Sequence, residues 1–214
     1  MKGSLLITRP EHEPAMCYLS RWSEKIIKEA KEKGVNVIDL YRNKANRKRV
    51  LGILEKRNPK LVVFNGHGGE DFVAGHDNEV ILKNDDEEAV NSKIIFARSC
   101  KSAKVLGETA IKKGAIAYLG YKEDFWLVYT KEKIFKPLED KTAELFLEPS
   151  NYVPIALLKG HSTGEADNKS KNLFRKNIEK LIIEGPSSDD YYAIRYLLWD
   201  MTHQVCLGSQ AATF

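Results

Sequence analysis

Two apolar patterns alternate along this chain. Short, β-branched apolar runs are typical of buried strands, whereas apolar residues at every third or fourth position are typical of helices that pack one face on a sheet. We expect strands at residues 4–8, 35–41, 61–65, 93–97 and 115–121, and a last short one in the QVCLG segment. We expect helices at residues 15–33, 44–57, 102–113, 140–148, 151–181 and 190–201. The order predicts an α/β fold with a mostly parallel sheet of about six strands between helical layers.

Glycine and proline mark the ends of several elements. Gly34 and Gly114 follow two helices, and the pair Asn58 and Pro59 ends the basic helix before the third strand. Residues 70–82 alternate between polar and apolar around a glycine, which predicts a small hairpin or a mobile loop.

Composition narrows the class of protein. With 214 residues and 43% apolar content, we expect one globular domain spanning residues 1–214. No segment has the length of a signal peptide core or a membrane span, so a cytoplasmic protein is the expectation. Three scattered cysteines argue for reduced thiols and against a disulfide framework or a structural zinc site.

Charged runs add little to the functional picture. The net charge of +4 is small for a chain with 34 basic and 30 acidic residues. The basic run at residues 42–60 interleaves charges with an apolar stripe and lacks an aromatic platform, so nucleic-acid binding is not expected. The acidic run at residues 84–88 is read as a solvated helix start, and no metal site or cofactor is expected.

Two apolar runs end at a chemically useful side chain. The run LVVFN leads into Gly66-His67-Gly68-Gly69, and the run IIFAR leads into Ser99 and Cys100. Because the carboxyl ends of parallel strands meet at one edge of a sheet, we expect His67 and Cys100 to lie at one site. A thiol and an imidazole placed together suggest a nucleophile with its acid/base partner.

The immediate surroundings of the two residues sharpen this hypothesis. Cys100 precedes an expected helix, where unpaired amides would lower the pKa of the thiol. The amides of Gly68 and Cys100 could both point toward a developing oxyanion. We read Cys17 and Cys206 as buried structural cysteines, and the remaining histidines as ordinary surface or capping residues.

These motifs resemble the caspase-like cysteine peptidases, especially CHAT domains and the gingipain-like family. The resemblance covers mainly residues 61–126 and includes the GAIAYLGY segment, with His preceding Cys in the chain. Glutamine amidotransferases and related thiol enzymes have the reverse order. The spacing from His67 to Cys100 is shorter than the roughly 50 residues of caspases, and the QAC[RQG]G signature is absent, so the chain is not a true caspase.

The resemblance implies a caspase-like αβα sandwich and peptide hydrolysis through a Cys100 thioester. His67 would protonate the leaving amine, and the Gly68 and Cys100 amides would hold the oxyanion. The two catalytic side chains need not be paired at rest, and such domains are often effectors activated by a protein partner, by cleavage or by oligomerisation.

Substrate preference stays open at this point. In caspase-like enzymes the residue two before the nucleophile lines the pocket, so Arg98 would favour an acidic residue before the scissile bond, unless it is paired structurally with a carboxylate. If Asp124 faces the pocket instead, a basic residue is favoured. Arg9, after the first strand, is a weaker pocket candidate. Two other functions remain: an inactive caspase-like scaffold that binds a partner, and a thiol hydrolase for small acyl substrates.

Overall fold

The computed structural model describes residues 3–214, so the first two residues of the expected domain lie outside the described part. A six-stranded sheet has the order β2-β1-β3-β6-β7-β8. The first five strands in this order are parallel, and β8 runs antiparallel to β7. The strands are β1 Ser4–Arg9, β2 Asn36–Tyr41, β3 Leu61–Asn65, β6 Ile94–Arg98, β7 Ala117–Tyr121 and β8 Gln204–Gly208.

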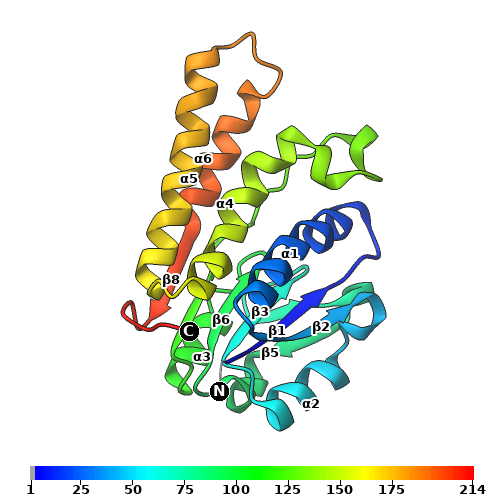
Figure 1. Cartoon of the computed structure of the whole chain (residues 1–214), viewed down its shortest axis with the longest axis vertical. Helices are drawn as coiled ribbons and strands as arrows, with labels where there is room; N and C mark the ends of the chain where they lie inside the picture. Colours follow the sequence, from blue (N-terminus) through cyan, green and yellow to red (C-terminus); the bar gives the residue numbers. More distant parts are fainter. Residues whose placement is uncertain (1–2) are drawn as a thin grey trace.

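Helices cover both faces of this sheet (Figure 1). On one face lie α2, Arg47–Arg57, and α3, Leu106–Lys112; on the other lie α1, Pro14–Glu32, α4, Lys141–Leu158, and α5, Thr163–Glu184. The helix α6, Ile194–His203, packs on α5 and leads into β8. In Figure 1 the pair α5 and α6 extends well beyond the sheet. The expected three-layer sandwich with a mostly parallel sheet is therefore confirmed.

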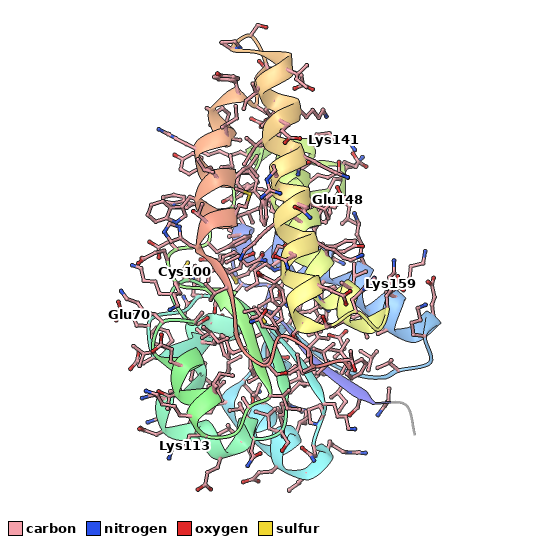
Figure 2. All side chains as sticks on the ribbon, turned by 90° about the vertical axis from the view of Figure 1, so that its left-hand side faces the viewer. Glu70, Cys100, Lys113, Lys141, Glu148 and Lys159 are labelled. Carbon is pink, nitrogen blue, oxygen red and sulfur yellow. The ribbon has the colours of Figure 1, made fainter. Side chains whose placement is uncertain are left out.

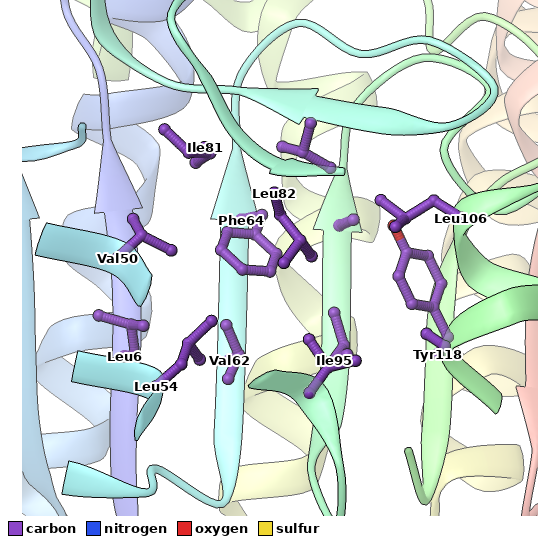
Figure 3. Close-up of a cluster of buried hydrophobic side chains, with 14 of the residues drawn as sticks. Leu6, Val50, Leu54, Val62, Phe64, Ile81, Leu82, Ile95, Leu106 and Tyr118 are labelled. Atoms are coloured by element: carbon purple, nitrogen blue, oxygen red, sulfur yellow. The ribbon is translucent and has the colours of Figure 1, made fainter. Parts of the chain in front are cut away.

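Each face of the sheet carries its own apolar cluster because successive side chains of a strand point to opposite faces. Leu6, Val62, Phe64 and Ile95 face α2 and α3 (Figure 3), and their neighbours along the strands, among them Val63, face α1 and α4. Four of the strands, β1, β3, β6 and β7, are buried along nearly their whole length. Burial on both faces explains why these strands read as continuous apolar runs.

The segment after β3 folds as a hairpin, the first of the two forms, hairpin or mobile loop, that its alternation left open. The strands β4, Phe72–Ala74, and β5, Val80–Lys83, pair antiparallel in a separate two-stranded sheet. In Figure 3 this hairpin crosses the carboxyl ends of the parallel strands. It thereby covers part of the edge where the candidate site lies.

Several helix boundaries differ from the prediction, and two of these differences have a local cause. The helix expected at residues 102–113 begins only at Leu106, since Lys101 adopts a left-handed φ of 58° and its amide donates to Glu123 O. The helix expected to break near residue 150 continues through Pro149 and Pro154 to Leu158. The break falls at Gly160, with a φ of 86°, and α5 starts at a capping box between Ser162 and Glu165. Among the helices within residues 3–214, none has the length and apolar character that a membrane span requires.

Candidate active site

The turns that carry His67 and Cys100 leave the sheet side by side. Asn65 at the end of β3 is in register with Arg98 at the end of β6. The amide of Gly66 donates to Arg98 O at 3.4 Å, which continues the pairing one residue further. Cys100 lies at the end of the sheet, near the base of the helices α5 and α6 (Figure 2). The structure thus brings together the two motifs that the sequence placed at one edge.

Gly68 allows the two turns to touch. A Cβ atom at this position would lie 2.7 Å from Cys100 O, 2.9 Å from Ser99 Cβ and 3.0 Å from Ser99 Oγ. Distances this short between heavy atoms are repulsive, so any side chain would force the turns apart. The close approach is therefore available only to glycine.

The amides of Gly68 and Cys100 remain free. Within residues 3–214, neither has a hydrogen-bond acceptor. Partly buried amides are usually paired, so two unpaired donors on turns in contact are candidates for binding an anion. The oxyanion role of these amides stays a prediction.

Glu13 holds the imidazole of His67. Its Oε1 lies 2.5 Å from His67 Nε2, and the side chains are 36% and 46% exposed respectively. The Nε2–H group donates to the carboxylate, which leaves Nδ1 as the ring nitrogen for proton exchange. Sequence reasoning missed Glu13. The signal was its place in the loop after the first strand, which ends at the same edge as β3 and β6.

The thiol of Cys100 is partly buried and points toward the segment after β7. Its nearest hydrogen-bond acceptor is Phe125 O, 3.9 Å from Sγ. Burial raises the pKa of this thiol, and the carboxyl groups of Asp124 and Asp200 raise it further. The predicted lowering of the thiol pKa by a helix amino terminus is therefore wrong, because α3 begins only at Leu106. No hydrogen bond joins Cys100 to His67 within the described residues.

Arg98 does not line a pocket. Its side chain is completely buried, although it was expected to face the substrate. Its Nε and Nη2 atoms donate to Asn65 Oδ1 at 3.0 and 2.7 Å. Nη1 donates to Asn151 Oδ1 at 2.9 Å, and Nη2 also donates to Ser23 Oγ at 3.1 Å. Arg98 thus connects the sheet edge to α1 and α4, and within the described chain no carboxylate pairs with it.

The other two pocket candidates lie in different surroundings. Asp124 is 46% exposed, and its Oδ1 lies 3.4 Å from the Nζ atom of Lys101, the residue after Cys100. Arg9 is nearly buried and binds Asp39 with two hydrogen bonds of 2.9 and 2.7 Å. Its charge is therefore neutralised within the fold, so Asp124 is the pocket candidate that lies near the thiol.

Asp200, on α6, is a further acidic group that sequence reasoning missed. Its side chain is fully buried, and its Oδ1 accepts from the amide of Trp126 at 2.9 Å. Its Oδ2 has no hydrogen-bond partner among residues 3–214, and burial raises the pKa of this carboxyl well above its ordinary value. Asp200 fixes the segment at residues 124–126 against the thiol, and its position inside an amphipathic helix gave no signal of this role.

A mostly parallel six-stranded sheet between helical layers, with the His67 and Cys100 turns at one edge, is the arrangement of the caspase-like fold. Gingipain R is a solved protein with a similar fold. The crystal structure of the Arg specific cysteine proteinase gingipain R matches with a TM-score of 0.65 and 12% identity, covering 98% of this chain and 46% of that chain.

Two further solved structures support the same fold. The complex of Porphyromonas gingivalis RgpB pro- and mature domains has a TM-score of 0.65 at 11% identity, covering 99% of this chain and 49% of that chain. A structure described only as a protease has a TM-score of 0.50 at 16% identity, covering 98% and 47%. The chain thus spans about half the length of these proteins. No family model and no curated protein matches the sequence.

Proposed function

We propose that this chain is a cysteine endopeptidase. The observation that carries the proposal is the contact between the Gly68 turn, which follows His67, and the Cys100 turn, together with the unpaired amides of Gly68 and Cys100 within residues 3–214. The Glu13–His67 pair at the same edge supplies an oriented acid/base group. The likeness in fold to gingipain R supports the same chemistry.

In the proposed reaction, Cys100 Sγ attacks the carbonyl carbon of the scissile bond. The thiol proton passes to His67, and the negative charge on the carbonyl oxygen is stabilised by the Gly68 and Cys100 amides. His67 then protonates the leaving amine as the C–N bond breaks, which leaves a thioester. A water molecule, deprotonated by His67, hydrolyses the thioester and restores the thiol.

The raised pKa of the Cys100 thiol supports a resting state of low reactivity. At neutral pH the thiol is protonated, and no hydrogen bond within residues 3–214 connects it to His67. Substrate, a protein partner, cleavage or oligomerisation would have to bring the two side chains together. All three cysteines are free, which fits the reducing cytoplasm that we propose as its location.

A basic residue before the scissile bond is the preference that we propose. Asp124 supports it because its carboxyl group interacts with the thiol, whereas Arg98 is enclosed by the fold. The Arg specificity stated for gingipain R agrees with this preference. An anionic group beside the nucleophile would attract a lysine or arginine side chain and repel an acidic one.

The test is cleavage of a peptide library that contains every residue before the scissile bond. Cys100→Ala and His67→Ala should abolish cleavage, whereas Cys206→Ala, which removes a thiol on β8, should preserve it. Absence of cleavage together with an unreactive Cys100 would favour an inactive scaffold. Cleavage of small thioesters or esters alone would favour a small acyl substrate, and a reactive Cys100 without cleavage would indicate a missing activator.

A further inference from the structure

Two histidines lie close together in the loops beside the candidate active site. His12 belongs to the loop between β1 and α1, and His76 opens the turn between β4 and β5. Their rings meet edge to face with centroids 5.2 Å apart. Asp77 adds a carboxylate, and one ligand atom from each of the three residues lies within 4.8 Å of the others.

The hydrogen bonds of His12 leave a nitrogen available. His12 Nε2 lies 3.2 Å from Asn78 Oδ1, so it carries the proton of the neutral ring. His12 Nδ1 then has a lone pair, yet this atom is buried and has no hydrogen-bond partner in the described part of the chain. Such a nitrogen can donate its lone pair to a cation without any change of protonation.

We propose that His12, His76 and Asp77 bind one Zn²⁺ ion. Two imidazoles and a carboxylate suit Zn²⁺, whereas Ca²⁺ and Mg²⁺ prefer sets composed of oxygen atoms. Tetrahedral zinc bonds of about 2.0–2.2 Å need ligand atoms closer than those found here, so the side chains must move inward. Asp77, with 79% of its side chain exposed, is free to do so, while His76 is 17% exposed and already positioned.

Binding at His76 would also affect the loop that holds Glu13. The amide of Glu11 donates to His76 Nδ1 at 3.2 Å, so in the neutral ring the proton is on Nε2. Coordination through Nε2 transfers this proton to Nδ1 and breaks the bond from the Glu11 amide. Glu11 is two residues from Glu13, the partner of His67. Metal binding is therefore expected to disturb the acid/base pair of the candidate site.

The test is Zn²⁺ titration of the metal-free chain of 214 residues against a chromogenic chelator. We expect one site per chain, with affinity at least about tenfold weaker in His12→Ala, His76→Ala and Asp77→Asn, by analogy with the loss on changing groups that support a metal site. Asp77→Asn changes an exposed side chain, so a loss of Zn²⁺ binding in this variant would not result from unfolding. His161→Ala is the matched control, since His161 has an acidic neighbour, Glu165, at 3.9 Å but no second histidine.

Co²⁺ distinguishes this site from binding at the catalytic thiol. We expect visible d–d bands without a sulfur-to-cobalt charge-transfer band, unchanged in Cys100→Ala. The Glu11 amide resonance should shift on Zn²⁺ addition in the wild type but not in His76→Ala. Equal affinity in the three ligand variants, or binding lost in Cys100→Ala, would overturn the proposal. None of these measurements requires peptide cleavage, so they do not depend on the proposed function.

Discussion

Arg98 and Cys100 stand two positions apart at the end of β6, yet their surroundings are opposite. The guanidinium of Arg98 is completely buried and makes four hydrogen bonds to the neutral side chains of Asn65, Asn151 and Ser23. The Cys100 turn reaches the surface, keeps a free amide and presents a partly buried thiol. The end of one strand thus supplies both a structural anchor, Arg98, and the proposed nucleophile, Cys100.

The difference shows how the carboxyl edge of the sheet is divided. An inner layer around Arg98 fixes the strand ends to the helices α1 and α4. An outer layer, which includes Gly68, Cys100, His67 and Glu13, keeps the groups that can react. Burial lowers the pKa of Arg98 to about 10, so it stays charged at neutral pH without a carboxylate partner in the described chain. A buried charge is costly unless it is hydrogen-bonded, so the charged guanidinium depends on the oxygen atoms of Asn65, Asn151 and Ser23.

Loss of the anchor is the largest effect that we expect. Arg98→Met leaves the amide oxygens of Asn65 and Asn151 unsatisfied in the interior, which should lower the free energy of unfolding by about 3–5 kcal/mol. Urea denaturation followed by circular dichroism measures this change. Arg175→Met is the matched control, because Arg175 is exposed and its nearest partner is the neighbouring Asn172.

A different result would support the original expectation that Arg98 lines the substrate pocket. An Arg98→Met protein as stable as the wild type, but with an altered preference before the scissile bond, would show that the guanidinium reaches substrate. The comparison between an inner anchor and an outer reactive layer would then fail.

Gly68→Ala should damage the outer layer. The added methyl group would lie 2.7 Å from Cys100 O, so the turns must separate and one oxyanion donor is displaced. We expect kcat/KM to fall by about 10²-fold, the typical loss of one such donor. In the control Gly52→Ala, on α2, no atom lies within 4 Å of the new Cβ. This control should keep full activity and gain up to about 1 kcal/mol of stability. An unchanged kcat/KM in Gly68→Ala would show that the Gly68 amide does not stabilise the oxyanion.

Glu13→Gln tests the support of His67 with a smaller expected effect. Glutamine preserves the shape of the side chain but removes the charge that stabilises an imidazolium formed during reaction. We expect kcat/KM to fall by about tenfold, which corresponds to 1.4 kcal/mol. Glu29→Gln is the control, because Glu29 lies within α1 and its Oε2 is 3.6 Å from Lys159 Nζ, an ion pair without a histidine. A change in stability without a change in kcat/KM would make Glu13 a purely structural helix-start residue.

The sequence predicted the sheet and the convergence of His67 with Cys100 because both depend on local pattern and on parallel topology. Each strand buried on two faces is a continuous apolar run, and the order of runs and helices brings their carboxyl ends to one edge. The hairpin after β3 was also visible in the alternation of its residues. These features required no knowledge of distant contacts.

Other features depend on contacts that no local pattern carries. The start of α3 at Leu106 follows from the left-handed Lys101 and its bond to Glu123, and Arg98 is enclosed by side chains from two distant helices. His12 and His76 meet only because the β4–β5 hairpin folds back over the first loop. Asp200 reaches the thiol from α6, which lies near the other end of the chain. A capping box at Ser162, in contrast, was a readable signal for the break after α4.

The smallest effect that we expect concerns the pH dependence of the reactivity of the Cys100 thiol. In a Cys17→Ser, Cys206→Ser background, only Cys100 reacts with iodoacetamide, and the rate follows the thiolate fraction. Because burial and then Asp124 raise the pKa of Cys100, the reactivity midpoint should lie above that of an ordinary cysteine. Asp124→Asn removes a nearby negative charge, so the midpoint should move to lower pH. Asp189→Asn, in an exposed loop, should leave it unchanged. A midpoint below the ordinary value, or one insensitive to Asp124, would mean that the thiol is already activated at rest and needs no partner.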